Sequence, residues 1–261
     1  MSLKVCVLGS GSSGNSTFVA SESQAILVDL GLPVLRTEKC LKALGVNPDE
    51  ISVVITHAHT DHIGFLEKFV SRHPRVSVYC HASSFPSVRA KVGARVPIIS
   101  VDGDFFIGDV TVTPFPVSHD VPCVGYSFLN MGRKVTVATD TGVFPDKLLN
   151  KVCDSDLMVI ESNHDETLLK ENGSYPVYLK NRILSQKGHL SNETSAHCVC
   201  YLASKGVKQI VLAHLSKENN YPELAFETYK NCLASQGITE GRDVRIEVAY
   251  PDRMSSLFEV N

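Results

Sequence analysis

Short apolar runs rich in β-branched residues recur along this chain, and turn residues separate them. The run Ile51-Ser-Val-Val-Ile55, followed at once by polar residues, is typical of a buried strand. By this pattern we predict strands at 3–8, 17–20, 25–30, 51–56, 76–80, 110–115, 124–129, 134–139, 157–161, 209–213 and 244–249. The close spacing of 17–20 to 25–30, and of 124–129 to 134–139, predicts two hairpins.

Between these runs, apolar positions recur with the helical period of about 3.6 residues. This pattern predicts helices at 34–44, 62–72, 83–92, 145–152, 176–186, 192–205 and 222–236, with Ser191 and Pro222 as helix-start signals. Strands and helices alternate in both halves, which favours a layered α/β architecture with mixed sheets over an all-β sandwich. No linker rich in Pro, Gly or Ser divides the chain, so we expect residues 1–261 to form a single domain.

Composition places the chain among ordinary globular proteins. Of its 261 residues, 43% are hydrophobic and 20% are charged. Its net charge of −3 excludes a general polycation, so any grip on nucleic acid must be local. No apolar segment is long enough to span a bilayer, and we see no signal peptide. The eight scattered cysteines are then expected to be reduced thiols in a cytoplasmic protein without a membrane partner.

The most informative segment is Thr-His-Ala-His-Thr-Asp-His at residues 56–62, directly after a predicted strand. Imidazoles and carboxylates are common ligands of zinc and related ions. His57, His59 and Asp61 would share a face if the segment were extended, with His62 turned elsewhere. That arrangement suits two adjacent ions better than one. The alternative is a histidine-rich loop that binds no metal.

Residues 9–14 match the GxGxxG pattern of dinucleotide-binding folds. The chain that follows Gly14 looks like turn and strand, which leaves no room for the crossover helix of a parallel βαβ unit. We therefore interpret the segment as a tight Gly/Ser loop. Its amides and the side chains of Ser12, Ser13 and Asn15 could line an anionic substrate pocket, or it could be a plain turn.

Further ligand-type residues stand at the ends of later strands. His119 follows the run 110–115, Asp140 follows 134–139, and His214 follows 209–213. Sites are often built where loops gather at strand ends, so the repeated placement favours a shared metal site.

With these motifs in order, the chain resembles the metallo-β-lactamase-fold hydrolases over nearly its whole length. Asp29, which closes an early strand, supplies the first of the five family motifs. The resemblance implies an αββα sandwich in which two mixed β-sheets are flanked by helices, with the metals at one edge. Carried over position by position, it implies two divalent metal ions: the first bound by His57, His59 and His119, the second by Asp61, His62 and His214, with Asp140 bridging both.

Other segments narrow the resemblance to the bacterial WalJ/YycJ nuclease group, related to the ribonuclease Z-like phosphodiesterases. The similar segments are 8–17, 161–165, 187–192 and 212–216. Asp140 stands where some true lactamases have a cysteine ligand. The resemblance implies a 5′-to-3′ exonuclease on double-stranded DNA. The sequence leaves the metal open between zinc and manganese, with iron also compatible.

In such a site, a hydroxide held between the ions would attack phosphorus. Asp61 would orient the attacking water and accept its proton. His189 would assist the leaving oxygen, since Gly188-His189-Leu-Ser191 resembles the His-Ser-Thr loop of ribonuclease Z-like relatives. The alternative for His189 is a histidine satisfied by hydrogen bonds at a helix start.

Candidate substrate contacts surround these residues in the sequence. Asn163 and His164 follow the predicted strand 157–161 and are either substrate contacts or loop residues. Arg182, with Lys180 and Lys187, is placed to contact backbone phosphates. We leave protein partners open.

Other functions remain compatible with the same ligands. One is a small-molecule hydrolase, either a cyclic phosphodiesterase or a glyoxalase II-like thioesterase, since no strong basic stripe is present. A non-catalytic metal-stabilised module and a di-iron redox protein are the alternatives from other classes.

Overall fold

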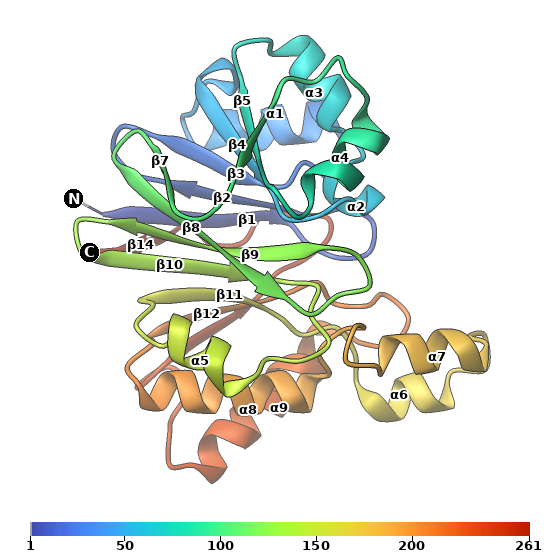
Figure 1. The fold of residues 1–261 in the computed structure, drawn as a ribbon. Helices are drawn as coiled ribbons and strands as arrows, with labels where there is room; N and C mark the ends of the chain where they lie inside the picture. The colour runs from blue at the N-terminus through green and yellow to red at the C-terminus, as the bar shows by residue number, and fades with distance from the viewer. Residues whose placement is uncertain (1) are drawn as a thin grey trace.

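The computed structural model describes residues 2–261, and in these residues two seven-stranded sheets face each other (Figure 1). The first sheet has the order β14 (Phe258–Val260), β1 (Leu3–Gly9), β2 (Ser16–Ala20), β3 (Ala25–Val28), β4 (Ile51–Ile55), β5 (Ser77–His81) and β6 (Ile98–Val101). The second has the order β13 (Arg245–Val248), β12 (Gln209–Ala213), β11 (Leu157–Glu161), β10 (Arg133–Ala138), β9 (Cys123–Asn130), β8 (Val110–Val117) and β7 (Phe105–Ile107). Both sheets combine antiparallel and parallel pairs, so both are mixed.

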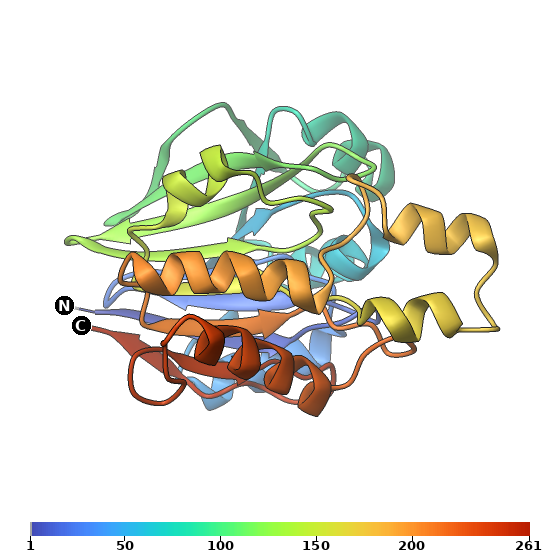
Figure 2. The ribbon, with the colours of Figure 1, turned by 90° about the horizontal axis from the view of Figure 1, so that it is seen from below.

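Helices cover the outer face of each sheet (Figures 1 and 2). The first sheet is flanked by α1 (Val34–Ala43), the 3₁₀ helix Pro48–Glu50, the single turn α2 (Thr60–Ile63), α3 (Leu66–Arg72) and α4 (Phe85–Val92). The second is flanked by α5 (Asp146–Val152), α8 (Asn192–Ser204) and α9 (Pro222–Ser235). Two further helices, α6 (Glu166–Glu171) and α7 (Val177–Ile183), project beyond the layers, as Figure 2 shows. The αββα sandwich expected from the resemblance is confirmed.

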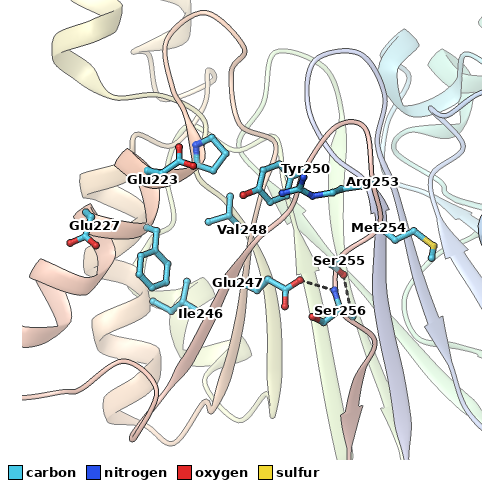
Figure 3. Close-up of a pocket in the computed structure, with 12 residues that line it drawn as sticks. Glu223, Glu227, Ile246, Glu247, Val248, Tyr250, Arg253, Met254, Ser255 and Ser256 are labelled. Atoms are coloured by element: carbon cyan, nitrogen blue, oxygen red, sulfur yellow. Dashed lines mark hydrogen bonds between the residues drawn. The ribbon is translucent and has the colours of Figure 1, made fainter.

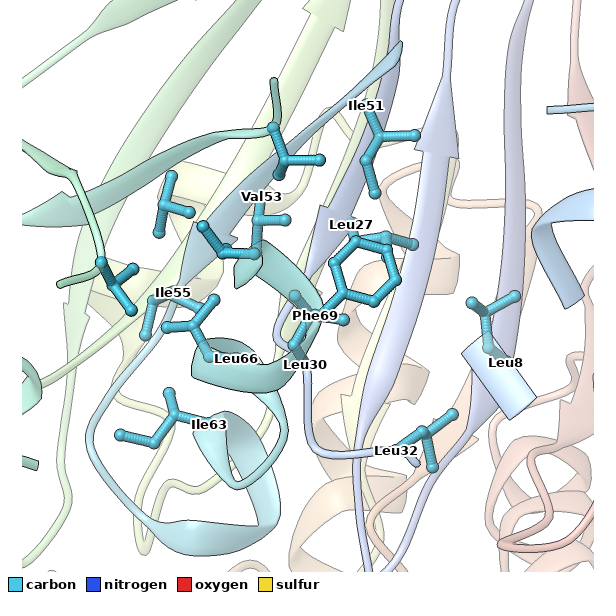
Figure 4. Packing of buried hydrophobic residues seen from close by; sticks show 14 of the residues in the cluster. Leu8, Leu27, Leu30, Leu32, Ile51, Val53, Ile55, Ile63, Leu66 and Phe69 are labelled. Atoms are coloured by element: carbon cyan, nitrogen blue, oxygen red, sulfur yellow. The ribbon is translucent and has the colours of Figure 1, made fainter. Parts of the chain in front are cut away.

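Three apolar layers hold the sandwich together, because the sheets are covered on both faces. In β4, Val53 packs toward the helices while Val54 packs toward the other sheet. In β11, Met158 likewise packs toward the helices and Val159 toward the other sheet. Figure 4 shows the layer under the first set of helices, with Phe69 of α3 beside Leu27 and Leu30. Burial on both faces explains why these strands read as continuous apolar runs and not as alternating ones.

The predicted strands and helices are present, with small shifts at their ends. Both predicted hairpins form, as β2–β3 and β9–β10. Three short edge strands, β6, β7 and β14, and the six-residue helix α6 were not predicted, since elements this short carry little periodic signal.

The helix predicted at 62–72 is wrong in its extent. The chain forms the short turn α2, passes Gly64, and starts again as α3. Asp61 therefore lies in a helical turn and not on an extended segment, and His62 faces the same centre as Asp61 instead of turning away, with its Nε2 3.3 Å from Asp61 Oδ2.

No helix within residues 2–261 is both long and apolar enough to cross a bilayer.

Three loops meet beside the helical turn α2, and Gly31 lies where they meet. The Gly31 amide donates to the Asn15 carbonyl at 3.0 Å, and the Asn15 amide donates to the Asp61 carbonyl at 2.8 Å. A Cβ atom on Gly31 would lie 1.6 Å from the Asp61 carbonyl oxygen. The absence of a side chain therefore allows the Gly/Ser loop to hold the backbone of Asp61 in place.

We predict that Gly31→Ala lowers the free energy of unfolding by about 3 kcal/mol, because the added methyl forces this junction apart. Denaturant titration checks this. Gly173→Ala is the matched control, since its Cβ would meet nothing within 4 Å. Superimposable unfolding curves for the two variants would contradict this account of the junction.

Candidate metal centre

Ligand-type side chains gather where several strands end. His57 and His59 follow β4, His119 follows β8, Asp140 follows β10, and His214 follows β12. Parallel neighbours in a sheet end at the same edge, so these loops lie close together.

The backbone turns sharply at this edge. Four non-glycine residues of the described chain have a left-handed backbone, and three of them follow strands here: Asp29 at φ 66°, Asp140 at 57° and His214 at 59°. That conformation is uncommon for residues other than glycine and recurs at functional sites. The turns direct these side chains back toward the common centre.

The residues implied by the resemblance meet in overlapping groups. Candidate ligand atoms within each of three groups lie within 4.8 Å of one another: His57, His59 and His119; Asp61, His62 and His214; and His57, His62 and Asp140. Asp140 Oδ2 lies 3.1 Å from His62 Nε2, and its Oδ1 lies 4.0 Å from His119 Nε2. Asp140 therefore lies between the two three-residue groups.

Each of the five histidines directs one ring nitrogen toward this centre, while an oxygen atom holds the other. The outer contacts are His57 Nδ1 to Thr56 Oγ1 at 3.0 Å, His59 Nε2 to Asp120 at 3.3 Å, His62 Nδ1 to Asp29 at 2.7 Å, His119 Nδ1 to the Gly188 carbonyl at 3.3 Å, and His214 Nδ1 to Glu161 at 2.8 Å. Among residues 2–261, the buried inner atom His57 Nε2 has no hydrogen-bond partner. An outer oxygen that fixes the imidazole tautomer is characteristic of metal-binding histidines, so the donor set fits divalent cations.

Glu161 organises the second half of the site. Its Oε1 lies 2.7 Å from His189 Nδ1 and 2.8 Å from His214 Nδ1. Its Oε2 accepts the backbone amides of Thr141 and Leu190 at 2.9 and 3.2 Å. Burial alone would raise the pKa of this carboxyl, but the His189 and His214 contacts hold it down to about 2. Glu161 thus stays ionised and fixes both rings.

The two halves of the site differ in electrostatics before a cation binds. Burial lowers the pKa values of His57, His59 and His119. Burial also opposes the charge on His62 and His214, but neighbouring carboxylates, Asp140 foremost, outweigh it. They raise the pKa of His62 well above its usual range and that of His214 to about 10.

A cavity of about 440 Å³ opens onto the site. Predicted residues in its wall are Ser12, His59, Asp61, Asp140, Asn163, Arg182, His189 and His214. The Arg182 guanidinium pairs with Asp120, and this carboxylate also contacts His59 and His119. The projecting helix α7 is thereby tied to the three-histidine group.

Three predicted substrate residues lie outside this wall. Asn15 is buried, and its side-chain amide donates to Asp61 Oδ2 at 3.1 Å, so it positions Asp61. His164 is 1% exposed, and burial lowers its pKa to about 4. Ser13 lines a neighbouring cavity.

A cavity of about 670 Å³, larger than the one at the histidine groups, lies between α9 and the 250–256 segment (Figure 3). Its lining includes Glu223, Glu247 and Arg253 and shares no residue with the histidine groups. Size alone therefore does not identify the reactive site here; the convergence of ligand atoms does.

Sequence reasoning missed the roles of two residues. Glu161 is a lone acid at the end of an apolar strand, the same placement that singled out Asp140 and His214. Asp120 directly follows His119, but its position carried no pattern that separates it from a surface acid.

Comparisons with known proteins agree with this geometry. A family model described as a β-lactamase superfamily domain matches residues 25–215. The Bacillus anthracis protein named exodeoxyribonuclease YycJ is 34% identical over 258 residues, which cover 96% of this chain and 97% of that protein. Exodeoxyribonuclease WalJ of Streptococcus pneumoniae serotype 2 is 34% identical over 265 residues, or 98% of each chain.

Solved structures support the same fold. The metallo-β-lactamase fold protein YhfI from Bacillus subtilis has a TM-score of 0.73 at 17% identity, over 99% of this chain and all of that one. Human tRNase Z, short form, has a TM-score of 0.65 at 16% identity, over 97% and 98% of the two chains. By family match, curated relatives and fold, the chain belongs to the β-lactamase superfamily, among its metal-dependent hydrolases of the metallo-β-lactamase fold.

Proposed function

We propose that this protein is a two-metal phosphodiesterase acting as a 5′-to-3′ exonuclease on double-stranded DNA in the cytoplasm. The observation that carries the proposal is the convergence of the ligand-type residues in overlapping groups, next to a cavity whose wall includes Asp61, Asp140 and His189. The names of the relatives, exodeoxyribonucleases at 34% identity over nearly the full chain, support DNA as the substrate.

Two divalent ions fit the paired groups of donors. His57, His59 and His119 would hold the first, Asp61, His62 and His214 the second, and Asp140 both. Mixed imidazole and carboxylate ligation accepts zinc or manganese, with iron also compatible. When bound, such a pair neutralises the phosphodiester charge and lowers the pKa of an attacking water.

Side chains around the cavity would accept the proton of the attacking water and supply one to the leaving oxygen. The pKa of Asp61 is held well below its usual range, since contacts with His214 and His62 outweigh the effect of burial. Asp61 is therefore ionised and can accept a hydrogen bond that orients the attacking water; we propose that it takes the water's proton as the bond to phosphorus forms. Glu161 holds His189 through Nδ1, which leaves Nε2 to supply a hydrogen bond or proton to the leaving oxygen.

Polar and basic residues of the wall bind the substrate. Ser12 and Asn163 offer hydrogen bonds to phosphate oxygens, and Lys91 and Arg182 offer positive charge. Arg182 is paired with Asp120, so an incoming phosphate competes with that carboxylate for the guanidinium. Phosphate binding by a few basic residues is consistent with a chain whose net charge is −3.

Asp61→Asn should lower kcat/KM on end-labelled duplex DNA by at least about 100-fold, because the amide neither accepts the proton nor supplies a charged ligand. The variant should keep the wild-type circular dichroism spectrum. Asp102→Asn is the control, since this carboxylate is 91% exposed. Wild-type cleavage rates in Asp61→Asn would refute the proposed mechanism.

Binding of metal ions should release protons from His62 and His214, the two histidines proposed to hold the second ion. The raised pKa values of His62 and His214 keep both rings protonated near neutral pH, and a ring must lose a proton to bind a cation. At pH 8 we expect zinc binding to release a proton from the His214 ring, together with those lost by His62 and by the activated water, with affinity rising as pH rises toward 10. A pH-indicator titration in weak buffer measures this release.

The control for that titration is His214→Ala, which should release about one proton fewer. Equal release by the variant and the wild type would contradict the assignment of His214 to the second ion.

A further inference from the structure

Three cavities adjoin one another from the metal centre to the outer edge of β13. The metal cavity shares Ser12 and Ser216 with a second cavity of about 580 Å³. The second shares Pro222 and Tyr250 with the cavity of about 670 Å³ shown in Figure 3. An occupant of the middle cavity would thus touch the same two serines as a phosphate at the metal centre.

The lining of the middle cavity suits a flat, weakly polar group. Leu215, Tyr221, Tyr250 and Pro251 contribute to its wall. Tyr221 is 50% exposed, which is high for an aromatic side chain beside an apolar cavity. Lys217 and Asp252 contribute one charge of each sign. A neutral aromatic ring bearing hydrogen-bonding groups matches this lining better than an anion does.

Local contacts hold the backbone of Tyr221 and the ring of Tyr250. The Tyr221 amide donates to Asn220 Oδ1 at 3.0 Å, and the Asn220 side-chain amide donates to the Ser162 carbonyl at 2.9 Å. The Arg253 guanidinium lies 3.6 Å from the centroid of the Tyr250 ring. These contacts fix the backbone at Tyr221 and cover one face of the Tyr250 ring, which reduces the entropy lost when a ligand binds there.

The Gly/Ser loop forms the boundary toward the metals. A Cβ on Gly11, which has φ +150°, would lie 3.4 Å from the Leu215 carbonyl and 3.5 Å from Pro251 Cβ. The loop therefore lies against both walls of the middle cavity, and Ser12 stands between that cavity and the metal centre.

Beyond the far end of the middle cavity, acidic side chains would repel the phosphates of a continuing strand. Glu223, Glu227 and Glu247 line the third cavity, while its Arg253 is engaged with Tyr250 (Figure 3). Like charges repel, so a nucleic acid backbone would not continue into this region. The middle cavity is therefore suited to a group at the end of a strand.

We propose that the middle cavity is a nucleobase subsite. It receives the base of the terminal nucleotide whose phosphate is cleaved, stacked against Tyr221, with Ser12 and Ser216 beside the sugar–phosphate. This inference rests on the proposed phosphodiesterase function and extends it to the substrate. Stacking of one base on an aromatic side chain strengthens binding by about tenfold to a hundredfold.

Two chromogenic esters test the subsite on the intact, metal-loaded protein. Thymidine 3′-(p-nitrophenyl phosphate) carries a base joined to the scissile phosphate through its 3′-oxygen, as the 5′-terminal nucleotide of DNA is, whereas methyl p-nitrophenyl phosphate carries no base. Tyr221→Ala should raise KM for the thymidine ester about tenfold or more and leave the methyl ester unchanged. Tyr221→Phe should retain wild-type kinetics, and Tyr178→Ala, a 75% exposed tyrosine on α7, is the matched control.

Each alternative outcome is distinct. Equal losses on both esters would show that Tyr221 is structural and would overturn the subsite. A wild-type protein without preference for the thymidine ester would overturn the subsite while the phosphodiesterase function stands. Hydrolysis of neither ester, nor of DNA, by metal-loaded protein would remove the proposed function and this inference with it.

A duplex with an abasic terminal nucleotide gives a second measurement. Wild-type cleavage of the first bond should slow about tenfold relative to the intact duplex, because the base that stacks is missing. Tyr221→Ala should cleave both duplexes at the same rate. Additive losses from the variant and the missing base would contradict the proposed contact.

Discussion

A carboxylate that is cut off from water needs positive charge or hydrogen-bond donors around it. Asp140 is 1% exposed, and it lies among His62, His119 and His214 at the edge where the strands end. Burial opposes its ionisation, yet His214 and His62 hold the pKa of Asp140 well below its usual range. The charge of this one side chain therefore depends on the loops that follow β4 and β12, and those loops depend on the sandwich.

Two kinds of contact in the sandwich fix the positions of the candidate ligands. Apolar layers on both faces of each sheet fix where the strands end. Buried acids then fix the rings: Asp29 holds His62, and Glu161 holds both His189 and His214. Because Glu161 contacts a metal-ligand candidate and the candidate acid for the leaving oxygen, it would couple cation binding to proton transfer in the proposed mechanism.

Much of this arrangement could be predicted from the sequence. Period and turn residues located the long strands and helices, because buried elements impose a regular apolar pattern. The candidate ligands could be found because most of them are polar residues just after an apolar strand. The edge strands β6, β7 and β14 carry only short and partly exposed segments, so the pattern was too weak to show them.

Other features depend on tertiary contacts that no local pattern records. Asp61 lies in a helical turn because Gly31 and Asn15 hold its backbone from a distant loop. Asn15 was expected to face substrate but instead contacts Asp61, and Asp120 joins His59 to Arg182 across the fold. The run of adjoining cavities past Tyr221 likewise joins loops far apart in the chain.

The most direct measurement is anomalous X-ray diffraction from crystals soaked in zinc. The account predicts two peaks, one among His57, His59 and His119 and the other among Asp61, His62 and His214, with Asp140 in contact with both. Peaks only elsewhere, or one peak that leaves Asp140 uncoordinated, would contradict it.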